Sequence, residues 1–170
     1  MDSDPAWPEA YRAQEQRIRA AVGDAALGVE HVGSTSVPGL PAKSVIDIDL
    51  IVADSADEDA YVPALERTGF VLGVREPWWY EHRMLASSEP RVNLHVFSPD
   101  AAEAARHIIF RDWLRTHPED RALYRDAKLA AAADANAAGE HVVEYNARKQ
   151  RVIREIYARA FAAAGLLAAG

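Results

Sequence analysis

The stretch that decides the fold is His31-Val32-Gly33-Ser34-Thr35-Ser36-Val37-Pro38-Gly39-Leu40-Pro41-Ala42-Lys43-Ser44-Val45-Ile46-Asp47-Ile48-Asp49-Leu50. It contains the end of one predicted strand, a loop rich in Gly, Ser and Thr, and an apolar strand interrupted by two aspartates. Because side chains alternate across a strand, Asp47 and Asp49 share one face, roughly 7 Å apart. Two such carboxylates repel each other and resist burial. A bound Mg²⁺ ion would balance their negative charges, because Mg²⁺ prefers one or two carboxylates plus substrate phosphates as ligands. The alternative to a metal site is that both aspartates lie on a solvated face of the sheet and pair with arginines.

The loop before this strand predicts contact with a phosphate. Glycine at position 33 allows the backbone to approach a ligand closely, and the hydroxyls of Ser34, Thr35 and Ser36 and nearby backbone N–H groups can donate to phosphate oxygens. A Gly-Ser pair alone is a weak signal. Its place ahead of Asp-x-Asp inside an apolar strand is a stronger one.

The run from His31 to Asp49 is similar to the signature of the GrpB family, a branch of the polymerase-beta-like nucleotidyltransferase superfamily. The resemblance covers nearly the whole chain, because it continues in Trp7-Pro8, in Asn93-Leu94-His95-Val96, in His107-x-x-Phe110-Arg111-Asp112-Trp113-Leu114 and in the last helix, which contains Lys149. It implies that Gly33 and Ser34 hold phosphate and that Asp47 and Asp49 bind metal.

In that superfamily a third carboxylate comes from a neighbouring strand. The counterpart here is Arg91–Phe97, whose matching face carries no acid. Asn93 and His95 are candidates for a weaker metal ligand and a base, because the ordinary pKa of histidine suits proton transfer near neutral pH. Glu81 or Glu30 are the candidates to replace the missing carboxylate.

Further residues have a binding interpretation beside a plainer one. His31 either lines the pocket or orients the loop, Lys43 contacts phosphate or pairs with an aspartate, and Arg83 reaches an anionic substrate or lies on a solvated face. The resemblance favours Lys128 and Lys149 as basic residues that face the pocket. The aromatic cluster at 78–80 either packs in the core or stacks on a planar ligand.

The order of elements predicts an α+β fold, because strands come first and helices afterwards. With the resemblance, we expect a minimal nucleotidyltransferase-type mixed sheet of about five strands, with flanking helices and a C-terminal helical portion. No linker divides the chain, so one domain is expected over residues 1–170. The predicted strands are Leu27–Val32, Val45–Val52, Phe70–Val74, Trp78–Ala86 and Arg91–Phe97. Helices are predicted over Pro8–Val22 and Asp57–Thr68, and from Ser98 onward.

Composition restricts the partners and the compartment. The 19 basic against 26 acidic side chains give a net charge of -7, which disfavours long nucleic acid and anionic membrane surfaces. The chain has no cysteine, which excludes disulfides and thiolate zinc sites. No segment approaches the roughly 20 apolar residues of a membrane span, and the N-terminus is polar and acidic, unlike a signal peptide. We therefore expect a soluble, cytoplasmic protein.

The function expected from these features is a Mg²⁺-dependent nucleotidyl- or phosphoryl-group transferase. The donor would be a nucleoside triphosphate and the acceptor a small molecule, whose proton Asp49 or His95 would take. Two alternatives stay open. One is a noncatalytic relative that binds a nucleotide or a phosphorylated small molecule. The other is a different metal-assisted or acid–base enzyme that uses His31 and His95 with Asp47.

Overall fold

The computed structural model describes residues 2–134 and 141–166. The chain divides into two compact units, residues 1–108 and residues 109–170. The expectation of one domain over the whole chain stays a prediction, and each unit is described by itself.

The first unit is built on a mixed sheet. Within the described residues the sheet has five strands in the order β1-β2-β5-β4-β3. The central pair β2–β5 is parallel, and the other neighbours are antiparallel. This confirms the predicted α+β class with a mixed sheet of five strands. The strands are β1 (Gly28–Val32), β2 (Ile46–Ile51), β3 (Val71–Glu76), β4 (His82–Ser88) and β5 (Arg91–Phe97).

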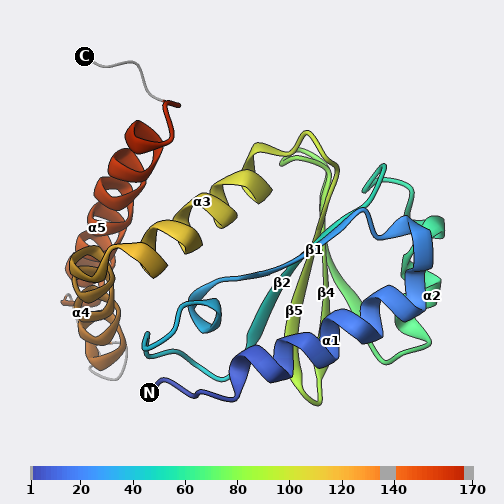
Figure 1. Ribbon diagram of the computed structural model, residues 1–170, viewed down its shortest axis with the longest axis horizontal. Coiled ribbons are helices and arrows are strands. Elements are labelled where there is room, and N and C mark those ends of the chain that lie inside the picture. Colours follow the sequence, from blue (N-terminus) through green and yellow to red (C-terminus); the bar gives the residue numbers. More distant parts are fainter. Residues whose placement is uncertain (1, 135–140, 167–170) are drawn as a thin grey trace. The chain divides into compact units, whose positions relative to one another are not determined.

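One face of the sheet carries the hydrophobic core. Helix α1 (Trp7–Val22) crosses the strands on this face, and α2 (Val62–Glu66) lies beside it (Figure 1). The even-numbered β2 residues Ile46, Ile48 and Leu50 are at most 3% exposed and pack with residues of α1, α2, β4 and β5. Each fully buried aliphatic side chain of this kind stabilises the fold by about 1.5–3 kcal/mol. The odd-numbered β2 residues are therefore left for the opposite face.

The strand register decides which polar residues meet on that opposite face. Asp47 lies beside Asn93, and Asp49 lies beside His95, across the parallel β2–β5 pair. On the other side of β5, Met84 is the cross-strand partner of His95. Residues paired in this way have side chains on the same face of the sheet. The predicted juxtaposition of the two aspartates with Asn93 and His95 is thus present.

Two predicted elements differ from the structure. The helix expected over Asp57–Thr68 is broken into a 3₁₀ turn, Glu58–Ala60, and the short helix α2, because Pro63 has no N–H to donate to the preceding turn. The strand expected over Trp78–Ala86 begins only at His82. Tyr80 and Glu81 have positive φ angles of 55° and 49°, which reverse the chain, so Trp78 and its neighbours form a turn.

The second unit is helical. The helices concerned are α3 (Ala102–Thr116), whose last part belongs to this unit, α4 (Pro118–Asp134) and α5 (His141–Ala163). Phe110 stacks on Tyr157 at 4.5 Å between ring centroids, and Arg159 pairs with Asp120 at 2.6 Å. These contacts join α3, α4 and α5. No described helix has both the length and the apolar character that crossing a membrane requires.

Candidate functional site

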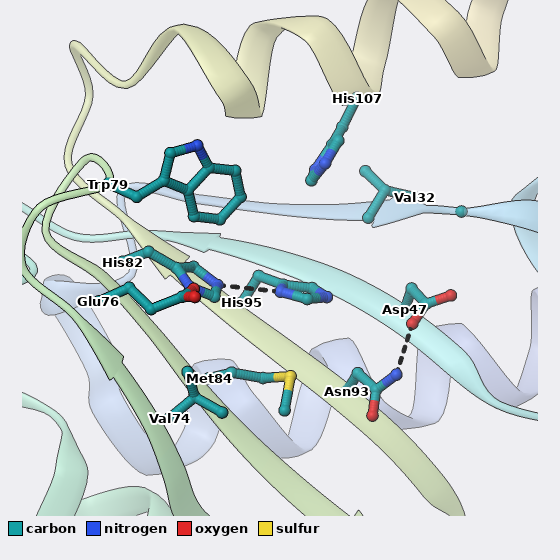
Figure 2. Close-up of a pocket in the computed structure, with 11 residues that line it drawn as sticks. Val32, Asp47, Val74, Glu76, Trp79, His82, Met84, Asn93, His95 and His107 are labelled. Atoms are coloured by element: carbon teal, nitrogen blue, oxygen red, sulfur yellow. Dashed lines mark hydrogen bonds and ion pairs between the residues drawn. The ribbon is translucent and has the colours of Figure 1, made fainter. Parts of the chain in front are cut away.

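A cavity of about 580 Å³ lies over the polar face of the sheet. Figure 2 shows Asp47 and Asn93 at one end and Glu76, Trp79 and His82 at the other. The structure thereby brings together four residues predicted from the sequence, Gly33, Asp47, Asn93 and His95. The lining residues are Val32, Gly33, Asp47, Val74, Glu76, Trp79, His82, Met84, Asn93, His95 and His107.

Gly33 and Asp47 form the most closely packed part of this cavity. Gly33 has φ 68° and ψ -169°, a conformation that is essentially restricted to glycine. A Cβ atom at this position would lie 2.5 Å from Asp47 Oδ2 and 3.0 Å from Asp47 Cβ. Asn93 Nδ2 donates a hydrogen bond of 2.8 Å to Asp47 Oδ1. Glycine is therefore needed here because the backbone passes against the Asp47 side chain.

Asp49 is buried beneath the cavity against His107. It is 1% exposed, and His107 Nδ1 donates to its Oδ2 at 2.8 Å. The other ring nitrogen of His107 lies 3.5 Å from Glu103 Oε1. Asp49 Oδ1 is buried and has no hydrogen-bond partner among the residues that the structure describes. An orphaned buried carboxylate oxygen is unfavourable by itself and is a typical attachment point for a cation.

Burial and pairing shift the pKa values of both partners. Burial raises the pKa of Asp49, although His107 opposes this by its hydrogen bond and charge. Burial lowers the pKa of His107, but hydrogen bonds to Asp49 and Glu103 outweigh it and raise the pKa to about 9. His107 is therefore an imidazolium at neutral pH, and its positive charge lies against the buried carboxylate.

This shift predicts a pH dependence of stability. The pKa of His107 is raised from about 6.5 in the unfolded chain to about 9, so its stabilisation is fully present below pH 6.5 and is lost as pH rises through 9. We expect the free-energy difference between the wild type and His107→Asn to decrease over this window. The groups facing His107 are Asp49, Glu103 and His95. Urea unfolding of both proteins between pH 6 and pH 9.5 measures this free-energy difference. A difference that stays constant over the range would contradict the prediction.

Three side chains at the other end of the cavity form a hydrogen-bonded chain. His82 Nδ1 lies 2.8 Å from Glu76 Oε2, and His82 Nε2 lies 3.0 Å from His95 Nδ1 (Figure 2). His82 is buried between Trp79 and Phe97, with ring-centroid distances of 5.0 and 4.9 Å. Burial, and then the neighbouring charges of His82 and His107, lower the pKa of His95 to about 4. His95 is therefore neutral at pH 7 and has a lone pair on one ring nitrogen.

The donor atoms suit Mg²⁺ in kind. Asp47 lines the cavity, and Asp49 supplies the orphaned buried oxygen two residues further along the same strand. Within the described part of the chain, however, no three His, Cys, Asp or Glu side chains are grouped so that they could hold a metal ion. The two candidates for a third carboxylate do not complete such a group. Glu30 is the cross-strand partner of Asp49, and Glu81 Oε2 lies 3.4 Å from Arg83 Nη1.

Two of the three loop hydroxyls, those of Thr35 and Ser36, have hydrogen-bond partners within the protein. Ser36 Oγ donates to Gly33 O at 2.6 Å, and Thr35 Oγ1 lies 3.0 Å from His31 Nε2. Thr35 and Ser36 are each 4% exposed, and Ser34 is half-buried in the same 3₁₀ turn. None of the three is among the residues described as lining the cavity. The structure supports a role for the Thr35 and Ser36 side chains in fixing the loop.

Three basic candidates lie away from the cavity. His31 is on the core face of the sheet, where it stacks on Tyr11 at 4.6 Å. Arg83 is also on that face, because its cross-strand partner is Val96, and its Nε donates to Glu58 at 2.6 Å. The expectation that Arg83 reaches a pocket ligand is therefore not met in this structure, since a strand alternates its faces. Lys43 is exposed in the segment before β2.

Lys128 and Lys149 belong to the second unit. Lys128 Nζ lies 5.5 Å from the centre of the Tyr124 ring, and Lys149 is half-buried on α5. Their expected contact with a ligand stays a prediction.

The sequence reasoning missed His107, His82 and Glu76 as members of the site. His107 stands at the start of the helical segment that carried part of the resemblance, and that was its available signal. The sequence contains no such signal for His82 and Glu76, because their approach to His95 depends on where the turn before β4 ends.

These features define a class of α+β proteins with a mixed sheet and a cavity lined by aspartate and histidine. The chain belongs to the GrpB family, because the family model described as GrpB protein matches residues 1–159. A UPF0157 protein of Halalkalibacterium halodurans is 46% identical over 160 residues, which cover 94% of this chain and 80% of that protein. A dephospho-CoA kinase of Mycolicibacterium paratuberculosis is 32% identical over 93% of this chain, but only 44% of that protein is covered. The crystal structure of the conserved protein GrpB from Enterococcus faecalis matches with a TM-score of 0.76 and 27% identity, covering 95% of this chain and 98% of that one.

Proposed function

We propose that the cavity binds a nucleotide or a related phosphorylated small molecule together with Mg²⁺, and transfers its nucleotidyl or phosphoryl group to a small acceptor. The observation that carries this proposal is Asp47 in the lining of the cavity, together with Asp49 two residues further along the same strand, whose Oδ1 is buried without a partner among the described residues. A bound cation would satisfy this oxygen and balance the carboxylates.

The charge of the cavity supports a cation-bound ligand. Among the described residues no lysine or arginine lines it, whereas Asp47 and Glu76 do. The positive charge of His107, which also lines the cavity, is paired with Asp49 and Glu103, so we expect a cation to accompany a bound phosphate. Asp47 and Asp49 would hold Mg²⁺ in company with phosphate oxygens, and the cation would supply charge neutralisation to the transferred group. His95, which is neutral at pH 7, would accept the proton of the acceptor hydroxyl.

The dimensions and the relatives suggest which ligands to test first. A volume of about 580 Å³ is within the range of about 300–1,000 Å³ for sites that bind small molecules. One relative is named dephospho-CoA kinase, and that protein is more than twice as long as the part of it that matches this chain. Dephospho-CoA therefore joins the common nucleotides as a candidate ligand for this chain.

We expect Asp47→Asn to reduce Mg²⁺-dependent nucleotide binding by at least about tenfold, which corresponds to 1.4 kcal/mol. The change removes a charge that would face the cation, while the new amide oxygen can still accept the hydrogen bond from Asn93. Calorimetric titration with ATP, GTP, CTP, UTP and dephospho-CoA, with and without Mg²⁺, measures it. Asp59→Asn is the matched control, because Asp59 is exposed and outside the cavity.

The outcomes of this titration separate the candidate functions. Mg²⁺-dependent binding without turnover in the presence of candidate acceptors would favour a noncatalytic binding protein. Absence of binding to every ligand would contradict the transferase proposal. It would favour the second candidate, a cation-independent acid–base enzyme, which the hydrogen-bonded chain from Glu76 to His95 supports.

A further inference from the structure

We propose that Glu76 and His82 act with His95 as a proton relay, which fixes the tautomer of His95 and receives the proton that His95 removes from an acceptor hydroxyl or water. This inference deepens the proposed function and rests on it only in treating the cavity as a reaction site. Glu76 and His82 are positioning residues in this scheme, whereas His95 is the group that faces the acceptor.

The donors and acceptors of the chain can be assigned in order from Glu76. An ionised carboxylate only accepts, so the contact of 2.8 Å requires a proton on His82 Nδ1. We take His82 to be neutral before the transfer, so that its lone pair is on Nε2. The contact of 3.0 Å to His95 consequently requires that His95 Nδ1 carries the proton and donates it. One carboxylate thus determines the tautomers of two histidines.

The assignment leaves His95 Nε2 as a hydrogen-bond acceptor in the cavity. Figure 2 shows the His95 ring extending from its contact with His82 towards Asp47. Asp47 and Asn93 line the end of the cavity that this edge of the ring faces. The lone pair is therefore presented to the place where the proposed ligand and its acceptor would meet.

The proton transfer balances within the three side chains. The acceptor O–H proton passes to His95 Nε2, and its oxygen keeps the electron pair with which it attacks. The proton on His95 Nδ1 passes to His82 Nε2, so His95 is neutral again. His82 becomes an imidazolium hydrogen-bonded to the Glu76 carboxylate. The positive charge thereby moves away from His107, whose ring lies 6.1 Å from His95, and next to a carboxylate.

The burial of the chain suits this transfer. The His82 side chain is 4% exposed, so it exchanges protons through its two hydrogen-bond partners. The Glu76 side chain is 35% exposed and reaches solvent. The chain therefore leads from the cavity to water.

The tautomer of His95 in the ligand-free chain tests the relay. Long-range ¹H–¹⁵N correlation spectra of the ¹⁵N-labelled protein, at about pH 8, identify the protonated ring nitrogen of each histidine. We expect His95 as the Nδ1–H tautomer in the wild type. We expect His82→Phe, which retains an aromatic ring but removes the acceptor, to shift His95 towards the Nε2–H tautomer. The His95 signals are assigned as those missing from His95→Gln.

A second variant acts at a distance from His95. Glu76→Ala frees His82 to carry its proton on Nε2 and donate it to His95 Nδ1, so we again expect His95 to become the Nε2–H tautomer. His117→Phe is the control, because His117 belongs to the second unit and stacks on Trp113. It should leave the His95 signals unchanged, and circular dichroism checks the folding of each variant.

Either of two results would overturn the relay. One is a wild-type His95 that carries its proton on Nε2. The other is a His95 tautomer that is the same in the wild type and in folded His82→Phe and Glu76→Ala. The measurement uses no ligand, so it is independent of the nucleotide titration, and failure of one does not imply failure of the other.

Discussion

His107→Ala is expected to destabilise the first unit by about 3 kcal/mol, because breaking a buried ion pair leaves one charge without compensation. Asp49 is 1% exposed, and among the described residues its hydrogen bond comes from His107. Without the imidazole, both carboxylate oxygens would be buried without a partner. The loss should lie at the lower end of the range for buried pairs, since the His107 side chain is 25% exposed and water can enter from its side.

A double-mutant cycle distinguishes this ion pair from simple loss of packing. In the Asp49→Asn background the buried charge is absent, so His107→Ala should cost about 1 kcal/mol or less. Urea unfolding of the wild type, the two single variants and the double variant gives the four free energies of unfolding. Equal losses from His107→Ala in both backgrounds would show that the pair is not what stabilises this region. The near-ultraviolet spectrum of each variant checks that the native packing is retained.

The central part of the fold could be predicted because its signals are local. The alternation of Ile46 to Ile51 fixes both the strand and the common face of Asp47 and Asp49, and the strand at 91–97 was located at the residues where the structure has it. The parallel pairing of these strands then places Asn93 and His95 beside the aspartates. Strand periodicity therefore located the two strands, and the resemblance to the superfamily indicated that they are neighbours.

The rest of the site depends on backbone geometry that periodicity does not contain. The expected strand at 78–86 included Trp79 and Tyr80, but the turn continues to Glu81, and only this end point directs His82 to the cavity and Arg83 to the core face. A shift of the pairing register by one residue exchanges the two faces. His107 comes from a helix far along the chain, and its contact with Asp49 is a long-range one.

Gly33→Ala is expected to destabilise the first unit by about 3 kcal/mol and to abolish Mg²⁺-dependent ligand binding. Two effects add. The φ and ψ angles of 68° and -169° lie in a region that costs a residue with a Cβ about 1–3 kcal/mol. The new methyl group would also lie 2.5 Å from Asp47 Oδ2 and 3.0 Å from Asp47 Cβ, so Asp47 must move. Rotation of the carboxylate alone cannot relieve the contact with Cβ.

Gly39→Ala separates the two effects. Gly39 lies in the same loop region with φ 77°, but a Cβ there would meet nothing within 4 Å. It should lose about 1–2 kcal/mol through backbone strain and retain ligand binding. Thermal unfolding and the calorimetric titration are compared for both variants. If Gly33→Ala binds the ligand as well as Gly39→Ala does, the position of Asp47 against the loop is not required for binding. In that case the cation would have to be held mainly by Asp49, whose buried Oδ1 has no other partner in the described chain.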